Sequence, residues 1–139
     1  MDIKQAITVV MTRDALSVDV SQSVSSVRHL MSEKNLHHVP VVGDGKLIGL
    51  ISMSDILSIS YTEFVEDDSM RDRILDERCT IEDLMVREPV TLSYGATVGD
   101  AARVLSQGLF HSVPIVDDEG ALVGIVSSTD LIRYLASGG

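Results

Sequence analysis

The heptapeptide LHHVPVV at residues 36–42 returns as FHSVPIV at residues 110–116, shifted by 74 positions. A second segment, GLISMSD at 49–55, returns as GIVSSTD at 124–130 with a shift of 75 positions. The additional residue falls between the two segments, in a stretch of Gly, Asp and Glu with the composition of a turn. Since two copies of one fold tolerate a length change in a turn, the sequence predicts an internal duplication.

Both copies predict the same order of secondary structure. Each begins with an amphipathic helix, whose apolar positions recur at helical spacing. These positions are Val24, Val27, Leu30 and Met31 in the first copy, and Val98, Ala101, Ala102 and Leu105 in the second. A Val/Pro/Val strand, a turn and a second strand at 47–52 or 122–127 then form a hairpin, and a further helix begins near Asp55 or Asp130. The predicted fold class is a mixed α/β fold.

The stretch between the copies, residues 61–83, is acidic, with 9 acidic and 3 basic residues. We expect it to continue the last helix of the first copy and then to form an exposed connector. The sequence TIED at 80–83 fits a capping box, which predicts a short helical turn at Leu84 and Met85. A solvated linker with no special task is the simpler interpretation of its charge. The predicted domains are a first repeat with an acidic helical linker at 1–78 and a second repeat at 79–139.

Composition excludes several classes of protein. Aromatic residues make up 4% of the chain and hydrophobic residues 45%, so the core is built from small aliphatic side chains. The formal net charge of −10 disfavours nucleic-acid binding, which depends on Lys and Arg at phosphates. No apolar run reaches the length of a membrane span, and the first residues lack the apolar stretch of a signal peptide. We therefore expect a cytoplasmic protein that binds neither nucleic acid nor membranes.

Catalytic and metal-binding patterns are also missing. The sequence has no Gly-x-Ser-x-Gly elbow and no P-loop or Rossmann glycine pattern. Cys79 is the single cysteine and has no histidine at zinc-site spacing. His37 and His38 are adjacent in a predicted strand, so they point to opposite faces. We predict no catalytic residue, no metal site and no catalytic cofactor, and therefore a protein that is not an enzyme.

Three motifs recur in both copies in the same order. They are VMT at 10–12 and LMV at 84–86, His-x-Val-Pro-Val/Ile-Val in the middle, and Gly-x-x-Ser-x-Ser/Thr-Asp near the end. The duplicated set resembles the CBS domain, and the chain resembles a tandem CBS pair, or Bateman module, with nothing attached. The resemblance implies a β-α-β-β-α core in each repeat, with the repeats packed through their sheets about a pseudo-twofold axis. It also implies a regulatory ligand sensor that binds AMP, ADP, ATP or a related adenosyl ligand in two clefts between the repeats.

The last of these motifs has the chemistry that an adenine nucleotide needs. A carboxylate accepts hydrogen bonds from both hydroxyls of a ribose, which suits Asp130 and Asp55. The hydroxyl pairs beside them lie at a predicted strand-to-helix junction, where the N–H groups of the helix N-terminus favour an anion. The alternative interpretation is that these residues only cap a helix.

By resemblance, each cleft takes residues from both copies. The main nucleotide cleft would contain Thr12, Ser17, Leu36, His37, Ile125, Ser127, Thr129 and Asp130. The second would contain Ser52, Ser54, Asp55, Val86, Thr91, Phe110 and His111. Leu36 and Ile125 would flank the base in the main cleft. Because Val86 stands in the second cleft where Thr12 stands in the first, a polar contact is lost there, and we expect the main cleft to bind better.

A phosphate needs local cations in so acidic a chain. Arg13 and Arg87 occupy equivalent positions in the two copies, and Arg133 lies one helical turn after Asp130. These three are candidate phosphate contacts. The recurring histidines of the two clefts are further candidates, because a histidine can donate a hydrogen bond in either protonation state. An exposed arginine or a hydrogen-bonded histidine without a ligand is the alternative interpretation.

A second class of function stays open, in which the clefts are empty or degenerate. The same fold would then serve as a protein-interaction or dimerisation module that regulates a separate enzyme or transporter. The last helices of the two copies carry more apolar surface than a small pair can bury, which predicts a homodimer joined through helical faces. The apolar residues concerned are Ile56, Leu57, Ile59, Leu131, Ile132 and Leu135.

Overall fold

The computed structural model describes residues 2–58 and 67–138 of the chain. The chain divides into two compact units, and each unit contains segments of both repeats. Unit 1 comprises Met1–Ala15, Gly45–Leu47 and Val90–Gly139, and unit 2 comprises Leu16–Asp44 and Ile48–Pro89. The start of the first repeat therefore belongs to the same compact unit as the second repeat. The boundary between residues 78 and 79 stays a prediction about the repeat in the sequence.

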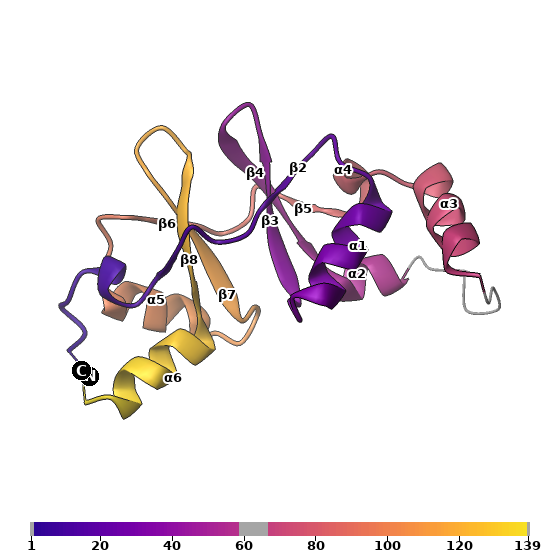
Figure 1. Ribbon diagram of the computed structural model, residues 1–139. Coiled ribbons are helices and arrows are strands. Elements are labelled where there is room, and N and C mark those ends of the chain that lie inside the picture. Colours follow the sequence, from indigo (N-terminus) through magenta and orange to yellow (C-terminus); the bar gives the residue numbers. More distant parts are fainter. Residues whose placement is uncertain (1, 59–66, 139) are drawn as a thin grey trace. The chain divides into compact units, whose positions relative to one another are not determined.

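Unit 1 is built on a four-stranded sheet in the order β1-β8-β7-β6 (Figure 1). Its centre is the antiparallel hairpin of β7 (Ser112–Val116) and β8 (Leu122–Ser127), which the repeat predicts. β6 (Leu92–Ser93) runs parallel to β7, and β1 (Thr12–Arg13) pairs antiparallel with β8. A strand from the start of the first repeat thus completes the sheet of the second.

Unit 2 has a sheet of the same design in the order β2-β3-β4-β5. Its central strands are β3 (His38–Gly43) and β4 (Lys46–Ser52), again as predicted. β2 (Val18–Asp19) runs parallel to β3, and β5 (Val86–Arg87) pairs antiparallel with β4. The repeats therefore exchange one strand each, because β5 comes from the start of the second repeat.

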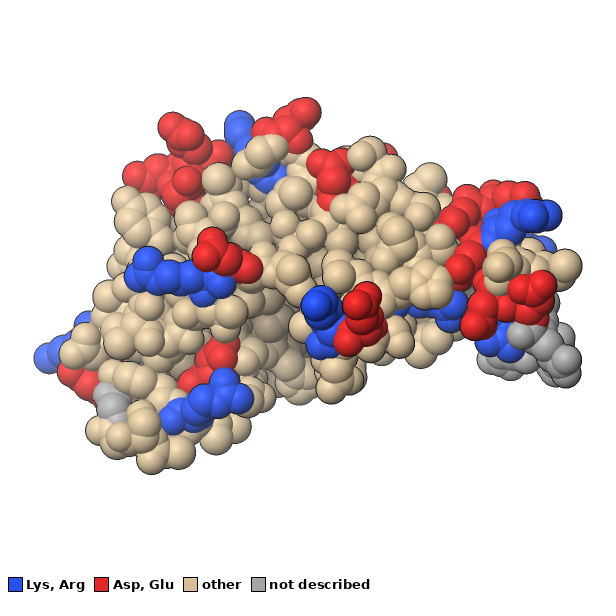
Figure 2. All heavy atoms as spheres, in the orientation of Figure 1, with Lys and Arg blue, Asp and Glu red and all other residues tan. Residues whose placement is uncertain are grey.

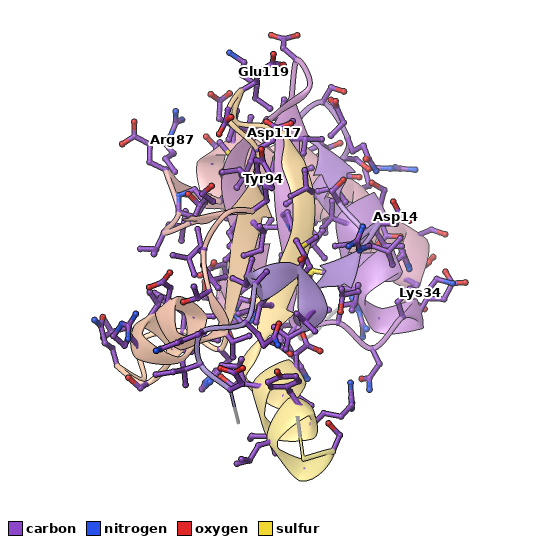
Figure 3. All side chains as sticks on the ribbon, turned by 90° about the vertical axis from the view of Figure 1, so that its left-hand side faces the viewer. Asp14, Lys34, Arg87, Tyr94, Asp117 and Glu119 are labelled. Carbon is purple, nitrogen blue, oxygen red and sulfur yellow. The ribbon has the colours of Figure 1, made fainter. Side chains whose placement is uncertain are left out.

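The length difference between the repeats falls in the hairpin turns. In the first repeat Asp44 and Gly45 both have positive φ, which is typical of a two-residue type I′ turn. In the second, Asp117 Oδ1 accepts hydrogen bonds from the backbone N–H groups of Glu119 (2.9 Å) and Ala121 (3.0 Å) and closes a longer turn (Figure 3). The prediction that the extra residue lies in a turn is confirmed.

Each helix of unit 1 contributes apolar side chains to the core of that unit. They are α5 (Val98–Leu105), α6 (Ser128–Ala136) and the short 3-10 helix η1 (Ile7–Val9). On α5 the predicted positions are buried, except that Ala102 lies at the margin of the core. The N-terminal segment packs beside α5, where the backbone N–H of Ile7 donates to the carbonyl of Ala96 (2.9 Å). The core of this unit consists of Ile7, Val98, Ala101, Leu105, Val113, Ile115, Val126 and Leu131.

In unit 2, the helices α1 (Val24–Glu33), α2 (Met53–Ser58) and α4 (Ile81–Leu84) likewise contribute apolar side chains to the core. The predicted face of α1 is confirmed, since its apolar positions are buried except for the partly buried Leu30. The capping box of α4 is also confirmed, with Thr80 as the N-cap. The helix begins earlier than predicted, at Ile81 directly after the N-cap, and it includes Leu84 but ends before Met85, which is its C-cap. The apolar core of unit 2 consists of Val18, Val24, Val27, Met31, Val39, Val41, Ile51, Ile56, Leu75, Ile81 and Met85.

The described part of the acidic connector contains a helix, α3 (Asp68–Arg78), that packs against α1 (Figure 1). Asp76 Oδ1 accepts from the backbone N–H of Ser25 (2.8 Å), and its Oδ2 accepts from Ser25 Oγ (2.6 Å). Leu75 of α3 is buried in the core of unit 2. Residues 61–66, on which part of the connector prediction falls, lie outside the described residues. The interpretation of α3 as a purely solvated linker is wrong, because it contributes a buried side chain and two hydrogen bonds to α1.

Candidate functional site

The N-terminus of α6 holds Asp130 in a defined geometry. Asp130 Oδ2 accepts from the backbone N–H of Ser127 (2.8 Å), and Ser127 Oγ accepts from the backbone N–H of Asp130 (3.0 Å). This reciprocal capping box confirms that the motif caps a helix. It engages one carboxylate oxygen only. Asp130 Oδ1 lies 3.8 Å from Nη1 of Arg133 in a long ion pair, so the second oxygen remains suited to a ligand hydroxyl.

The exchanged strand β1 brings Thr12 to the same place. Thr12 pairs with Ile125 of β8, which ends at the start of α6. Thr12 and Asp130 both line a groove of about 350 Å³. The volume lies at the lower end of the range that is usual for small-molecule sites. Residues 118 positions apart in the sequence thus share one site within unit 1, because β1 pairs with β8.

The groove is lined by both polar and apolar residues. The polar or charged ones are Thr12, Asp130, Arg133 and Ser137, and the apolar or aromatic ones are Val9, Val10 and Tyr134. A ligand that combines a flat apolar group with hydroxyls and a charge fits such a lining.

Four lining residues were not identified from the sequence, namely Val9, Val10, Tyr134 and Ser137. Tyr134 and Ser137 follow Asp130 at positions i+4 and i+7 on one face of α6, so helical spacing would have found them. Val9 and Val10 could not be found in that way, because only the pairing of β1 brings the N-terminal segment to α6.

The other predicted residues of the main cleft divide between the units. Ile125, Ser127 and Thr129 lie in unit 1 with Thr12 and Asp130. Ser17, Leu36 and His37 lie in unit 2. Leu36 packs against the core of unit 2, and the exposed His37 accepts a hydrogen bond from the backbone N–H of Met53 through its carbonyl (2.9 Å). Unit 1 therefore unites five of the eight residues predicted for this cleft.

The residues predicted for the second cleft divide in the same manner. Unit 2 holds Ser52, Ser54, Asp55 and Val86, and unit 1 holds Thr91, Phe110 and His111. Ser52 Oγ accepts from the backbone N–H of Asp55 (3.0 Å), as Ser127 does for Asp130. Val86 stands opposite Leu50 in the register in which Thr12 stands opposite Ile125. The correspondence between Val86 and Thr12 that the repeat predicts is therefore present in the strand pairing.

The three candidate phosphate contacts differ in their surroundings. Arg133 lines the groove, and its side chain is 75% exposed. Arg13 is exposed and follows Thr12 in β1, but it does not line the groove. Arg87 is in unit 2 and pairs with Glu82 at 3.4 Å. Arg133 is thus the cation that accompanies Thr12 and Asp130.

Other classes of site find little support among residues 2–58 and 67–138. On the face drawn in Figure 2, Lys and Arg side chains lie beside Asp and Glu rather than in a continuous basic patch. Within these residues no group of three or more His, Cys, Asp or Glu side chains is placed to hold a metal ion. No helix described there is both long and apolar enough to cross a membrane. Burial raises the pKa of the Cys79 thiol, and nearby Asp83 and Asp76 add to the effect.

Comparison with known proteins identifies the family. The model of the CBS domain matches residues 3–61 and 81–137, which together make up most of the chain. The chain belongs to the CBS-domain family. It carries two CBS repeats, as the duplicated motifs predict, and each has the β-α-β-β-α order that the resemblance implies.

Three proteins illustrate the similarity of this CBS pair to known ones. It is 33% identical over 123 residues to the uncharacterized protein MJ0188 of Methanocaldococcus jannaschii, covering 88% of this chain but only 41% of that protein. The structure of CBSX2, a CBS-pair protein of Arabidopsis thaliana, in complex with AMP matches with a TM-score of 0.79 at 26% identity, over 96% of this chain and 97% of that one. The CBS domain pair of MJ0100 in complex with 5′-methylthioadenosine and S-adenosyl-L-methionine matches with a TM-score of 0.73 at 25% identity, over 94% and 99% of the two chains.

Proposed function

We propose that this CBS pair is a regulatory sensor that binds an adenosine-containing ligand and carries no catalysis of its own. The observation that supports this most directly is the meeting of Thr12 and Asp130 in one groove. The ligands of the similar CBS pairs, AMP in CBSX2 and two adenosyl compounds in the pair of MJ0100, share an adenosine. An adenosine has the planar apolar base and the pair of ribose hydroxyls that the lining of the groove suits.

The residues predicted for the main cleft have the following proposed roles. Asp130 Oδ1 accepts hydrogen bonds from the ribose hydroxyls, while Oδ2 stays in the capping box. Thr12 donates to a polar edge of the nucleotide, and Ile125 flanks the base together with Leu36. The remaining contacts of this site would come from Ser17, His37, Ser127 and Thr129. Arg13 and Arg133 are proposed phosphate contacts.

We propose a second, weaker site in which Asp55 takes the part of Asp130. Val86 replaces the hydroxyl of Thr12 there, so one hydrogen bond to the ligand is missing. A single neutral hydrogen bond contributes about 0.5–1.5 kcal/mol, which corresponds to a few-fold to roughly tenfold in affinity. The other contacts would come from Ser52, Ser54, Thr91, Phe110, His111 and, at the phosphate, Arg87.

Thermal unfolding with a panel of ligands tests the proposed function. AMP, ADP, ATP, adenosine and S-adenosylmethionine are each added in increasing concentration, with GMP as the matched control for the base. A ligand that binds only the folded protein stabilises it by about 2.7 kcal/mol at a concentration of about 100 times Kd, so the melting temperature rises with concentration. At least one adenosine compound is expected to raise it more than GMP does. No rise with any adenosine compound would contradict the proposal.

The alternative function is that of an interaction module, and the proposed homodimer belongs to both functions. Leu57 on α2 is 58% exposed, and Ile132 and Leu135 on α6 are 65% and 56% exposed. Ile56 and Leu131 do not contribute, because each is buried in the core of its own unit, and Ile59 lies outside the described residues. The expectation that all six residues serve the dimer is therefore corrected for Ile56 and Leu131.

Light scattering at micromolar concentration tests the dimer. We expect twice the 15.0 kDa mass of one chain, and a monomer would contradict the proposal. The regulated enzyme or transporter and the cytoplasmic location stay predictions. An interaction module without a ligand would dimerise and yet show no thermal shift with any nucleotide.

A further inference from the structure

The charged groups that line the groove of unit 1 are Asp130 and Arg133. Asp130 is 15% exposed, and one of its oxygens is held by the backbone N–H of Ser127 at the start of α6. Its negative charge is therefore partly offset by the capping hydrogen bond and by the positive end of the helix. Arg133 is 75% exposed, and its ion pair with Asp130 is 3.8 Å long. Such an exposed, long pair contributes little stability, so Arg133 is free to turn toward a ligand at small cost.

We propose that this groove selects adenosine ligands by the charge on their 5′ substituent, and that Arg133 is the residue that determines this specificity. The proposal rests on the proposed function, since it assumes that the groove binds an adenosine. A 5′-phosphate carries negative charge and several acceptor oxygens, which a guanidinium can engage with two parallel hydrogen bonds. A 5′-sulfonium carries positive charge and no acceptor at that atom. When Asp130 is bonded to the ribose, the positive charge of Arg133 favours a 5′-phosphate and opposes a 5′-sulfonium.

The same unit contains a second arginine, Arg103, that serves as a control for the effect of Arg133 on ligand binding. On α5, Thr97 and Asp100 form a capping box, and Arg103 lies three residues after Asp100, as Arg133 follows Asp130. Arg103 is 69% exposed and pairs with Asp100 at 2.6 Å, but neither residue lines the groove. A change at Arg103 therefore alters the net charge by the same amount, removes a shorter exposed ion pair, and leaves the groove intact.

The experiment measures affinity by calorimetry for three compounds that share an adenosine. They are AMP, 5′-methylthioadenosine and S-adenosylmethionine. Their 5′ groups are an anion, a neutral thioether, and a sulfonium whose amino-acid chain adds one carboxylate and one ammonium, so that the whole group is cationic. The wild type is expected to bind in that order, with AMP favoured over the thioether by roughly tenfold, as for one charge-assisted contact. R133Q should reduce this preference to about twofold or less and leave the affinity for the thioether unchanged. R103Q should behave as the wild type.

The dependence on salt gives a second readout. The preference of the wild type for AMP should fall as ionic strength rises, whereas in R133Q it should no longer respond, because screening acts on the charge pair. A wild type that binds S-adenosylmethionine as tightly as AMP would overturn the proposal, as would a preference for AMP that survives in R133Q. If the wild type binds the thioether as tightly as AMP, the proposed selection by charge is wrong and the proposed function stands. If none of the three compounds binds, both fail.

Discussion

Met11 occupies the space that a side chain on Gly124 would need. Its Sδ lies 2.8 Å from the position of a Cβ at Gly124, and the carbonyl oxygen of Thr12 lies 2.9 Å from the same point. The equivalent pair in the other unit is Met85 and Gly49, where Met85 Sδ lies even closer to the position of a Cβ at Gly49. In each sheet, a glycine of the hairpin thus admits the methionine that precedes the exchanged strand. This packing holds Thr12 opposite Ile125 and so positions one side of the groove.

Replacing Gly124 by alanine should therefore destabilise the protein. The new methyl group would press on Met11 and on the backbone of β1, and backbone cannot move aside as a flexible side chain can. We expect G124A to lower the free energy of unfolding by about 1–3 kcal/mol in urea denaturation, the usual cost of overpacking. G95A is the matched control, since its new Cβ would meet only Ser93 Oγ at 3.7 Å. Equal stability of the two variants would show that β1 does not depend on this close approach.

Removing the carboxylate at Asp130 should weaken ligand binding more than the same change at Asp55. Asp130 has the hydroxyl of Thr12 in its groove, whereas the equivalent of Thr12 beside Asp55 is Val86. A charged acceptor on the ribose contributes about 1.5–3 kcal/mol, so D130A should lose about ten- to a hundredfold in affinity for the ligand that gives the largest thermal shift. Calorimetry on D130A and D55A compares the two sites directly.

The same change also removes a helix cap, which needs its own control. Asp100 is the matched residue, because it forms the same capping box on α5 away from the groove. D100A should lose about 1 kcal/mol of stability, as D130A should, and keep its affinity. A loss of affinity in D55A that equals or exceeds that in D130A would mean that Thr12 and Val86 do not rank the two sites.

Asp76 should stabilise the protein by joining α3 to α1. Its carboxylate accepts both the backbone N–H and the hydroxyl of Ser25, and Ser25 is only 9% exposed. D76A leaves the backbone N–H of Ser25 without its acceptor and the Ser25 hydroxyl with only Ser23 Oγ at 3.3 Å, and we expect a loss of about 1–3 kcal/mol in urea denaturation. D68A on the same helix should change stability by less than about 0.5 kcal/mol, since Asp68 is 77% exposed and its ion pair with Arg71 is 3.5 Å long. Similar losses of stability in both variants would show that the effect comes from the loss of a negative charge on α3 and not from the hydrogen bonds to Ser25.

Asp72 should make the stability of unit 2 depend on pH in acid. Partial burial raises the pKa of Asp72, but the hydrogen bond and charge of His29, with those of Arg28, outweigh it and hold the pKa below its ordinary value. Because the folded pKa is the lower one, the stabilisation is present above the ordinary carboxyl pKa of about 4 and is lost as pH falls through the folded value. The difference in unfolding free energy between wild type and D72N should therefore be largest above about pH 5 and shrink toward about pH 2.

The histidine supplies the control for this pH dependence. His29 Nε2 lies 2.7 Å from Asp72 Oδ2, so H29Q removes the main partner that lowers the pKa. In the H29Q background the difference caused by D72N should be smaller and should change less with pH. A difference that stays constant down to about pH 2 would contradict the assigned pKa shift.

Local features of this fold could be predicted from the sequence, because the interactions behind them join residues close together in the chain. The apolar face of α1 follows from the spacing of Val24, Val27 and Met31, and the cap of α4 follows from Thr80 and Asp83 three residues apart. Helical periodicity and side-chain hydrogen bonds to the nearby backbone act over one or two turns. The repeat itself, with its extra turn residue, is a property of the sequence.

Only the tertiary structure decided which segments meet. It placed Val9 and Val10 in the groove with α6, and it joined Asp76 to Ser25 across 51 residues. The likeness to CBS pairs led us to expect Thr12 near Asp130, but no periodicity or spacing in the chain did so. The physical reason is that strand pairing satisfies backbone groups that every residue carries, so the partner of β1 is chosen by packing, such as that of Met11 on Gly124, and not by a local pattern.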